Sequence, residues 1–62
     1  MASEIELVKV LSDKALLCRT KNEYLLNTYL IGLAFLRHEG VEYFCSSWID
    51  YDGYYYMRMI AE

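Results

Sequence analysis

The side chains most suited to nucleophilic chemistry in this chain are Cys18, Cys45 and His38. A thiol beside an imidazole could act as an activated nucleophile, because the imidazole takes the thiol proton. No local motif brings His38 to either thiol, so we interpret the cysteines as reduced thiols of a cytoplasmic protein. A structural zinc site needs about four ligands, and one histidine with two scattered cysteines falls short. We therefore predict no metal and no cofactor.

A second candidate for chemistry is the pair of carboxylates, Asp50 and Asp52, that flanks Tyr51. An acid–base pair needs a concave pocket, which a tight turn in a small chain does not provide. The dipeptide Asp52-Gly53 is instead typical of a two-residue hairpin turn, in which both residues take positive φ. The three glycines are far apart and form no phosphate-binding loop. The sequence thus predicts that the protein is not an enzyme.

The turn at Asp52-Gly53 must be held by two strands, which we predict at Val41–Tyr51 and at residues 54–61. A two-residue loop sets the pairing: Tyr51 opposite Tyr54, Ile49 opposite Tyr56 and Trp48 opposite Met57. We predict that one hairpin face packs on a helix, because methionine and tryptophan favour burial: Phe44, Trp48, Tyr55, Met57, Met59 and Ala61. The other face is expected to meet solvent or a partner: Val41, Tyr43, Cys45, Ser47, Ile49, Tyr51, Tyr54, Tyr56, Arg58 and Ile60.

The long stretch before the hairpin predicts one helix over residues 23–40. Thr20 and Glu23 have the spacing of a capping box, and Gly40 is placed to end the helix. At 100° per residue, one broad arc is expected to face the core: Leu25, Leu26, Tyr29, Leu30, Leu33 and Leu36. A second apolar ridge, formed by Tyr24, Ile31 and Phe35, lies among polar residues. A helix that is apolar on both sides is usually covered on both sides.

Two short strands are predicted ahead of the helix, at residues 4–11 and 15–19, with a turn at residues 12–14. The order strand, strand, helix, strand, strand predicts a single α+β domain over residues 1–62. Its antiparallel sheet would have four strands, with the helix packed across one face.

A chain of 62 residues buries only about 60% of its unfolded surface, so a partner subunit often adds to its stability. With neither a disulfide framework nor a metal site, we expect a homodimer that forms through the ridge of Tyr24, Ile31 and Phe35.

The charge-free run at residues 24–36 is shorter than the roughly 20 residues that span a membrane. The first residues also have neither the positive charge nor the apolar run of a secretory signal. No membrane association is predicted, and the cytoplasm is the expected location.

The net charge of −3 lies in the C-terminal part of the chain, because the acids and bases of residues 1–40 balance. Binding of duplex phosphates takes clustered lysine and arginine, so direct nucleic-acid binding is not expected. Tyrosine provides a large contact area at small entropic cost, which suits a protein-binding surface. Plain sheet stabilisation by cross-strand tyrosine pairs is the simpler interpretation of the same pattern. The residues predicted to bind a partner with a basic surface are Glu42, Tyr43, Asp50, Tyr51, Asp52, Tyr54, Tyr56 and Arg58.

In its small size, its acidity and its lack of motifs, the chain is similar in general character to inhibitors that bacteriophages encode against host proteins, anti-CRISPR proteins among them. The resemblance implies a viral inhibitor that occupies a basic surface of a nucleic-acid-handling protein. The alternative is a small structural or accessory subunit that self-assembles through its spare apolar faces.

Overall fold

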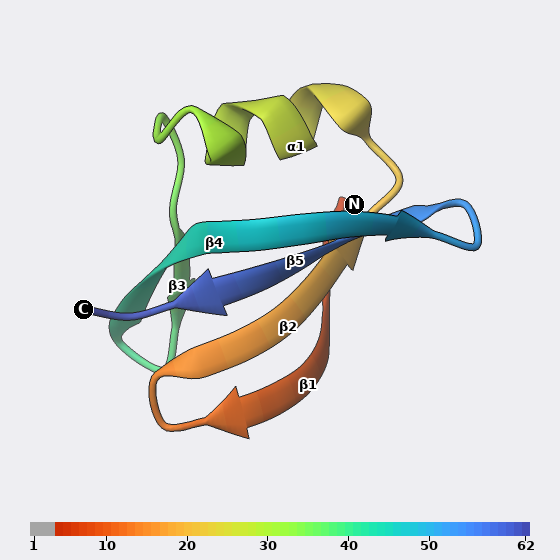
Figure 1. The fold of residues 1–62 in the computed structure, drawn as a ribbon. Coiled ribbons are helices and arrows are strands. Elements are labelled where there is room, and N and C mark those ends of the chain that lie inside the picture. Colours follow the sequence, from red (N-terminus) through yellow and green to blue (C-terminus); the bar gives the residue numbers. More distant parts are fainter. Residues whose placement is uncertain (1–3) are drawn as a thin grey trace.

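The fold, known from a computed structural model, is described for residues 4–62 and combines one helix with a curled antiparallel sheet (Figure 1). The elements are β1 (Ile5–Ser12), β2 (Ala15–Thr20), α1 (Glu23–Leu30), β3 (Leu36–His38), β4 (Val41–Tyr51) and β5 (Tyr54–Ile60). The sheet has the strand order β1-β2-β5-β4-β3 and closes into a half-barrel. The α+β class is therefore confirmed, but the sheet has five strands rather than the four predicted.

The helix is much shorter than predicted, because it ends at Leu30 instead of Gly40. Gly32 takes a φ of +80°, its N–H bonds to the carbonyl of Tyr29, and the N–H of Leu33 bonds to the carbonyl of Thr28. This pair of bonds is the Schellman arrangement, in which a left-handed glycine ends a helix. The chain beyond it is free to form β3.

The start of the helix also differs from the capping box predicted at Thr20. The N-cap is Asn22, whose Oδ1 accepts a hydrogen bond from the N–H of Leu25 at 3.1 Å. Thr20 is instead the buried end of β2, where its hydroxyl donates to the carbonyl of Glu4 at 2.7 Å. Gly40 belongs with Glu39 to the turn between β3 and β4, where both residues have positive φ.

The β4–β5 hairpin has the predicted register, with Tyr51 opposite Tyr54 and Trp48 opposite Met57. Asp52 and Gly53 take φ values of 54° and 82°, which confirms the predicted turn. A shift in register between Cys45 and Ser47 shows a β-bulge, which changes the face presented by the earlier part of β4.

The predicted faces of β4 are wrong ahead of this bulge. Tyr43 is buried and Cys45 half-buried on the core side, whereas Phe44 is 37% exposed opposite Ile60. The extra residue at Ser46 reverses the alternation of side chains between the two faces of the sheet. Odd-numbered residues of β4 therefore face the core before the bulge and the outer side after it. The faces of β5 are as predicted, with Met57 and Met59 completely buried.

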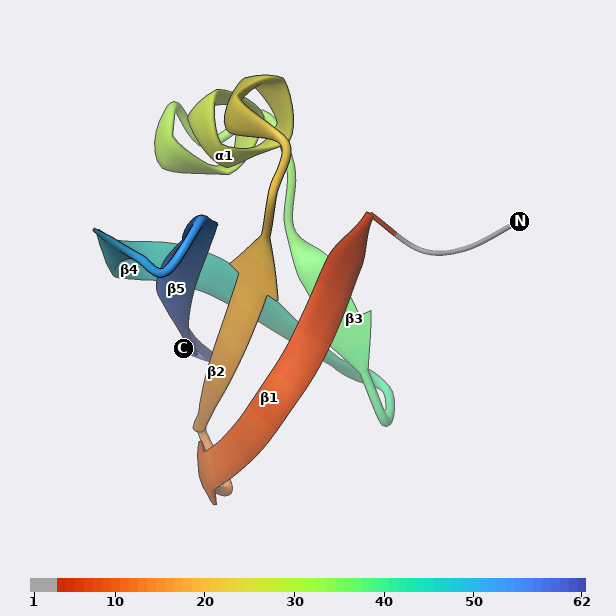
Figure 2. The same cartoon turned by 90° about the vertical axis from the view of Figure 1, so that its right-hand side faces the viewer.

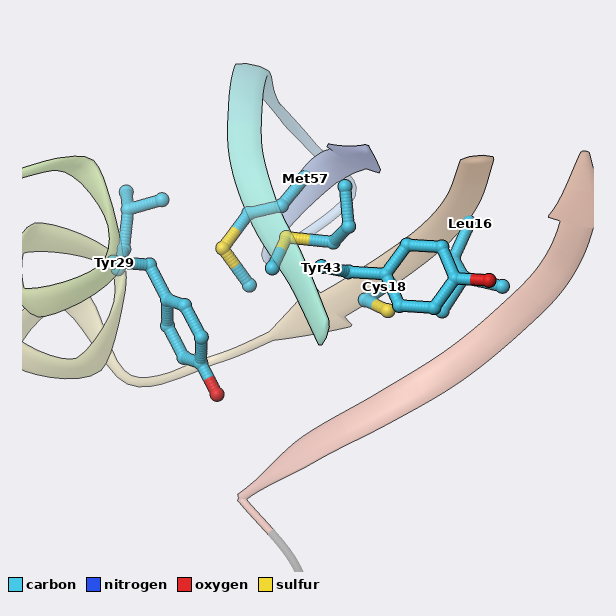
Figure 3. Close-up of a cluster of buried hydrophobic side chains, with 7 residues drawn as sticks. Leu16, Cys18, Tyr29, Tyr43 and Met57 are labelled. Atoms are coloured by element: carbon cyan, nitrogen blue, oxygen red, sulfur yellow. The ribbon is translucent and has the colours of Figure 1, made fainter. Parts of the chain in front are cut away.

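The core lies between α1 and the concave side of the sheet. It consists of Leu16, Cys18, Leu26, Tyr29, Tyr43, Met57 and Met59. In Figure 3, Met57 lies between Tyr29 of α1 on one side and Tyr43 with Cys18 on the other. Of the helix arc predicted to face the core, only Leu26 and Tyr29 are buried, and Leu33 is 77% exposed because it follows the end of α1.

We expect Leu26→Ala to destabilise the fold by about 2–5 kcal/mol, because it leaves a cavity under α1. Leu33→Ala, the matched control, is expected to change the free energy of unfolding by no more than about 0.5 kcal/mol. Urea denaturation followed by circular dichroism measures both. Equal destabilisation by the two substitutions would show that residues 31–36 continue the helix onto the core.

Candidate functional site

Several of the residues predicted to bind a partner come together on one side of the hairpin. We call this side, which points away from the core, the outer face. It is formed by side chains of β2, β5 and β4: Leu17, Arg19, Tyr54, Tyr56, Arg58, Ser47, Ile49 and Tyr51. Among its apolar and aromatic side chains, Tyr51 and Ile49 are the most open, with 67% and 65% of their surfaces exposed.

Arg19 holds the tyrosines of the outer face in place. Its Nε lies 2.8 Å from Oε1 of Glu6, and its Nη1 donates to the hydroxyl of Tyr56 at 3.1 Å. Its guanidinium carbon also lies 4.0 Å from the ring centroid of Tyr54. The hydrogen bonds to Glu6 and then to Tyr56 raise the pKa of Arg19 above its usual range, so it stays charged. Nothing in the sequence places this arginine in the site, yet in the structure it is the central support of the tyrosines.

Near the turn, the rings of the hairpin pack in two groups, one on each face. On the outer face, Tyr56 lies 6.2 Å from both Tyr51 and Tyr54 between ring centroids. On the core side, Trp48 meets Tyr55 edge-on at 5.9 Å, and the Tyr55 hydroxyl donates to Glu23 at 3.2 Å. This hydrogen bond and the negative charge of the nearby Glu23 carboxylate raise the pKa of Tyr55. Contacts of this kind on both faces hold the hairpin to β2 and to α1.

The structure separates the acids that the sequence analysis placed together with the tyrosines. Asp50 pairs with Tyr55, on the face that carries Glu23, while Asp52 lies in the turn. Glu42 lies at the far end of β4, where it forms an ion pair of 2.9 Å with Arg37 of β3.

Tyr43 cannot take part in a surface site as predicted, because it is only 4% exposed and belongs to the core. Its hydroxyl lies 3.4 Å from the carbonyl of Asp13, across the half-barrel. The β-bulge that follows it is the physical reason for this correction, since a straight strand would have placed it on the outer face.

A groove of about 430 Å³ runs along the outer face. Its walls are largely apolar, and it is lined by Leu17, Ser47, Trp48, Ile49, Tyr51, Tyr56 and Arg58. Leu17 could not be assigned to this site from the sequence, because its presence depends on β2 lying beside β5. Among residues 4–62, Arg58 has neither an ion pair nor a hydrogen bond to its side chain.

Within residues 4–62, no hydrogen bond or ion pair joins His38 to Cys18 or Cys45. Burial raises the pKa of the Cys18 thiol to about 11, and it also raises the pKa of Cys45. His38 lies in β3, with its Nε2 3.1 Å from the carboxylate of Glu39. The described part of the chain holds no group of three potential metal ligands, and within it no helix is long and apolar enough to cross a membrane.

None of the protein-family models, curated proteins or solved structures compared with this chain matches it significantly.

The two thiols should differ in reactivity, because Cys18 is fully buried and Cys45 is not. At pH 8 we expect iodoacetamide to modify Cys45 first, and Cys18 only as fast as the protein unfolds. Peptide mass spectrometry over time measures both rates, with Cys45→Ser as the control that isolates Cys18. Rapid labelling of Cys18 in the folded protein would contradict the assigned core and would reopen its interpretation as a nucleophile.

Proposed function

We propose that this protein is a non-enzymatic protein-interaction module that binds its partner through the β4–β5 hairpin. The observation that carries the proposal is the tyrosine cluster of the outer face, in which Tyr51 is 67% exposed while Tyr54 and Tyr56 are half-buried and held by Arg19. Tyrosine and arginine are frequent in the energetically important parts of interfaces. A rigid aromatic surface loses little conformational entropy on binding, so more of the contact energy is retained.

The charges at the end of the hairpin favour a partner with a basic surface. Asp50 and Asp52 are both exposed there, and Glu23 lies nearby on α1, bonded to Tyr55. Two bases also lie near the ring centroid of Tyr54, Lys21 with its Nζ at 4.9 Å and Arg19 with its guanidinium carbon at 4.0 Å, and Arg19 is paired with Glu6. Complementary charge steers association and opposes the wrong partners.

A basic surface that binds nucleic acid is a suitable target for an acidic hairpin of this kind. In this proposal the protein acts as a small inhibitor of the phage-encoded type, similar in general character to anti-CRISPR proteins. It would work by occupying the surface of a nucleic-acid-handling protein and would catalyse no reaction.

Asp50→Lys combined with Asp52→Asn should abolish capture of the partner from a lysate of the host cells. The asparagine tolerates the positive φ of the turn, so the free energy of unfolding should change by about 0.5 kcal/mol or less. The loss of binding follows from like charges meeting across the interface. Immobilised protein and quantitative mass spectrometry of the captured proteins give the measurement.

The matched control is Glu62→Lys combined with Glu39→Asn, which makes the same change in net charge away from the hairpin end. It also places asparagine at a positive φ, since Glu39 has a φ of 50°. This control variant should capture as much of the partner from the lysate as the parent protein does. Equal capture by the hairpin variant and the parent would refute the role of the acidic hairpin end.

A second candidate function is self-assembly as an accessory subunit, which the exposed apolar residues around α1 favour. Tyr24, Ile31 and Leu33 are 82%, 68% and 77% exposed. They do not form the helical ridge predicted for Tyr24, Ile31 and Phe35, because α1 ends at Leu30. Phe35 lies in the connection to β3, with its ring 5.8 Å from that of Phe44.

For this second candidate, sedimentation equilibrium should give twice the subunit mass of 7.4 kDa at micromolar concentration. Phe35→Glu should shift the mass toward the monomer, because a charge would be buried in the contact. Circular dichroism should show the variant still folded, since Phe35 is 45% exposed in the single chain. A monomer throughout this concentration range would exclude the homodimer.

A further inference from the structure

Much of β4 forms an open edge of the sheet. β3 pairs only with residues 41–43, whereas β5 pairs with β4 as far as Tyr51. Residues 46–51 are all exposed, and in Figure 2 the hairpin end of β4 reaches the outer limit of the sheet, to one side of α1. An edge of this kind offers unpaired N–H and C=O groups to another extended chain.

The register shows which backbone groups are free. Tyr51 and Tyr54 flank the two-residue turn, so this pair exchanges hydrogen bonds and the pairs behind it alternate. Ile49 therefore bonds toward β5, like Tyr51. The N–H and C=O groups of Trp48 and Asp50 point away from β5, toward the open edge.

The outer groove lies directly beside this edge. Ile49 and Tyr51 form its wall on β4, and Arg58 lies opposite Ser47 in the neighbouring strand. Because serine is short, the long side chain of Arg58 can extend past Ser47 to the edge. Its charge is unpaired within residues 4–62, and Lys9 adds a second cation across Leu17 on the same face.

The charges along the edge have a definite order. Asp50 presents a carboxylate on the core side near the turn, and Arg58 presents a cation on the outer side at Ser47. Between these positions lie Trp48 and Ile49, which are 43% and 65% exposed. A complementary strand would therefore need a base, two apolar residues and an acid.

We infer that the open edge of β4 accepts an extended segment of the partner protein as an added antiparallel strand. Along this segment a basic residue faces Asp50, two apolar residues face Ile49 and Trp48, and an acidic residue faces Ser47 within reach of Arg58. Main-chain hydrogen bonds supply affinity, and the charges set the register. The inference rests on the proposed function and specifies which partner segments it recognises.

A peptide fits this site better than a single-stranded nucleic acid does. Tyrosines and arginines could stack bases, but Asp50, Asp52 and Glu23 surround the end of the hairpin and repel phosphates. The free N–H and C=O groups of Trp48 and Asp50 also alternate at the spacing of another polypeptide strand.

Panning a displayed library of random eight-residue peptides on the parent protein tests the pattern without assuming a partner. The enriched sequences should contain a base, two apolar residues and an acid, in that order.

Arg58→Gln should weaken their binding about tenfold, because it removes a charge-assisted contact. Lys14→Gln, which removes a cation from the β1–β2 turn, is the matched control and should leave binding unchanged. Trp48, the one tryptophan of the chain, reports binding by its fluorescence.

Amide hydrogen exchange with a synthetic peptide of the enriched sequence tests the mode of docking. The N–H groups of Trp48 and Asp50 should gain protection, while those of Ile49 and Tyr51, already bonded to β5, serve as internal references. Unchanged exchange at Trp48 and Asp50 would overturn the inference. Enrichment without the charge pattern, equal binding by Arg58→Gln, or tighter binding of a ten-nucleotide oligothymidylate at the same edge would do so too.

The outcome separates this inference from the proposed function. If no patterned peptide binds while Asp50 and Asp52 are still needed for capture of a cellular partner, strand addition is refuted and the hairpin module stands. If both experiments fail, both proposals are refuted.

Discussion

The register of the β4–β5 hairpin is the constraint on which the rest of this structure depends. Asp52 and Gly53 both take positive φ, and this turn sets Tyr51 against Tyr54. Because side chains alternate along a strand, a slip of one residue would exchange the two faces of β5. The observed register buries Met57 and Met59 under α1 and leaves the tyrosines beside Arg19 on the outer face. The core and the candidate site thus have one common origin.

The small size of the domain explains why so much apolar surface stays outside this core. One eight-residue helix can cover only part of the concave face, so its two buried residues, Leu26 and Tyr29, must do most of the packing. The bulge near Ser46 helps, because it turns Tyr43 into the core, whereas Trp48 beyond the bulge packs against Tyr55 and stays 43% exposed. β4 also has an open edge beyond Tyr43, because β3 pairs only with residues 41–43, and this edge lies next to the outer groove.

The parts of the fold that could be predicted from the sequence are those set by short-range geometry. The bounds of β4, its turn and its pairing with β5 follow from Asp52-Gly53 and the strand-forming residues beside it. The length of α1 could not be predicted from the sequence, because apolar residues recur at helical spacing beyond Gly32. At Gly32 the backbone takes a left-handed conformation, which ends the helix. The bulge near Ser46 leaves no mark in composition, so Tyr43 was assigned to the wrong face. The groove was missed because Leu17 and Arg19 reach the hairpin only through the pairing of β2 with β5.

The register can be measured most directly by nuclear Overhauser contacts between Hα protons on β4 and β5. Pairs that do not exchange hydrogen bonds bring these atoms closest, with Cα atoms about 4.5 Å apart. We expect strong contacts between Trp48 and Met57 and between Asp50 and Tyr55. Strong contacts between Ile49 and Met57 instead would show a hairpin slipped by one residue, with a different core and no tyrosine cluster on the outer face.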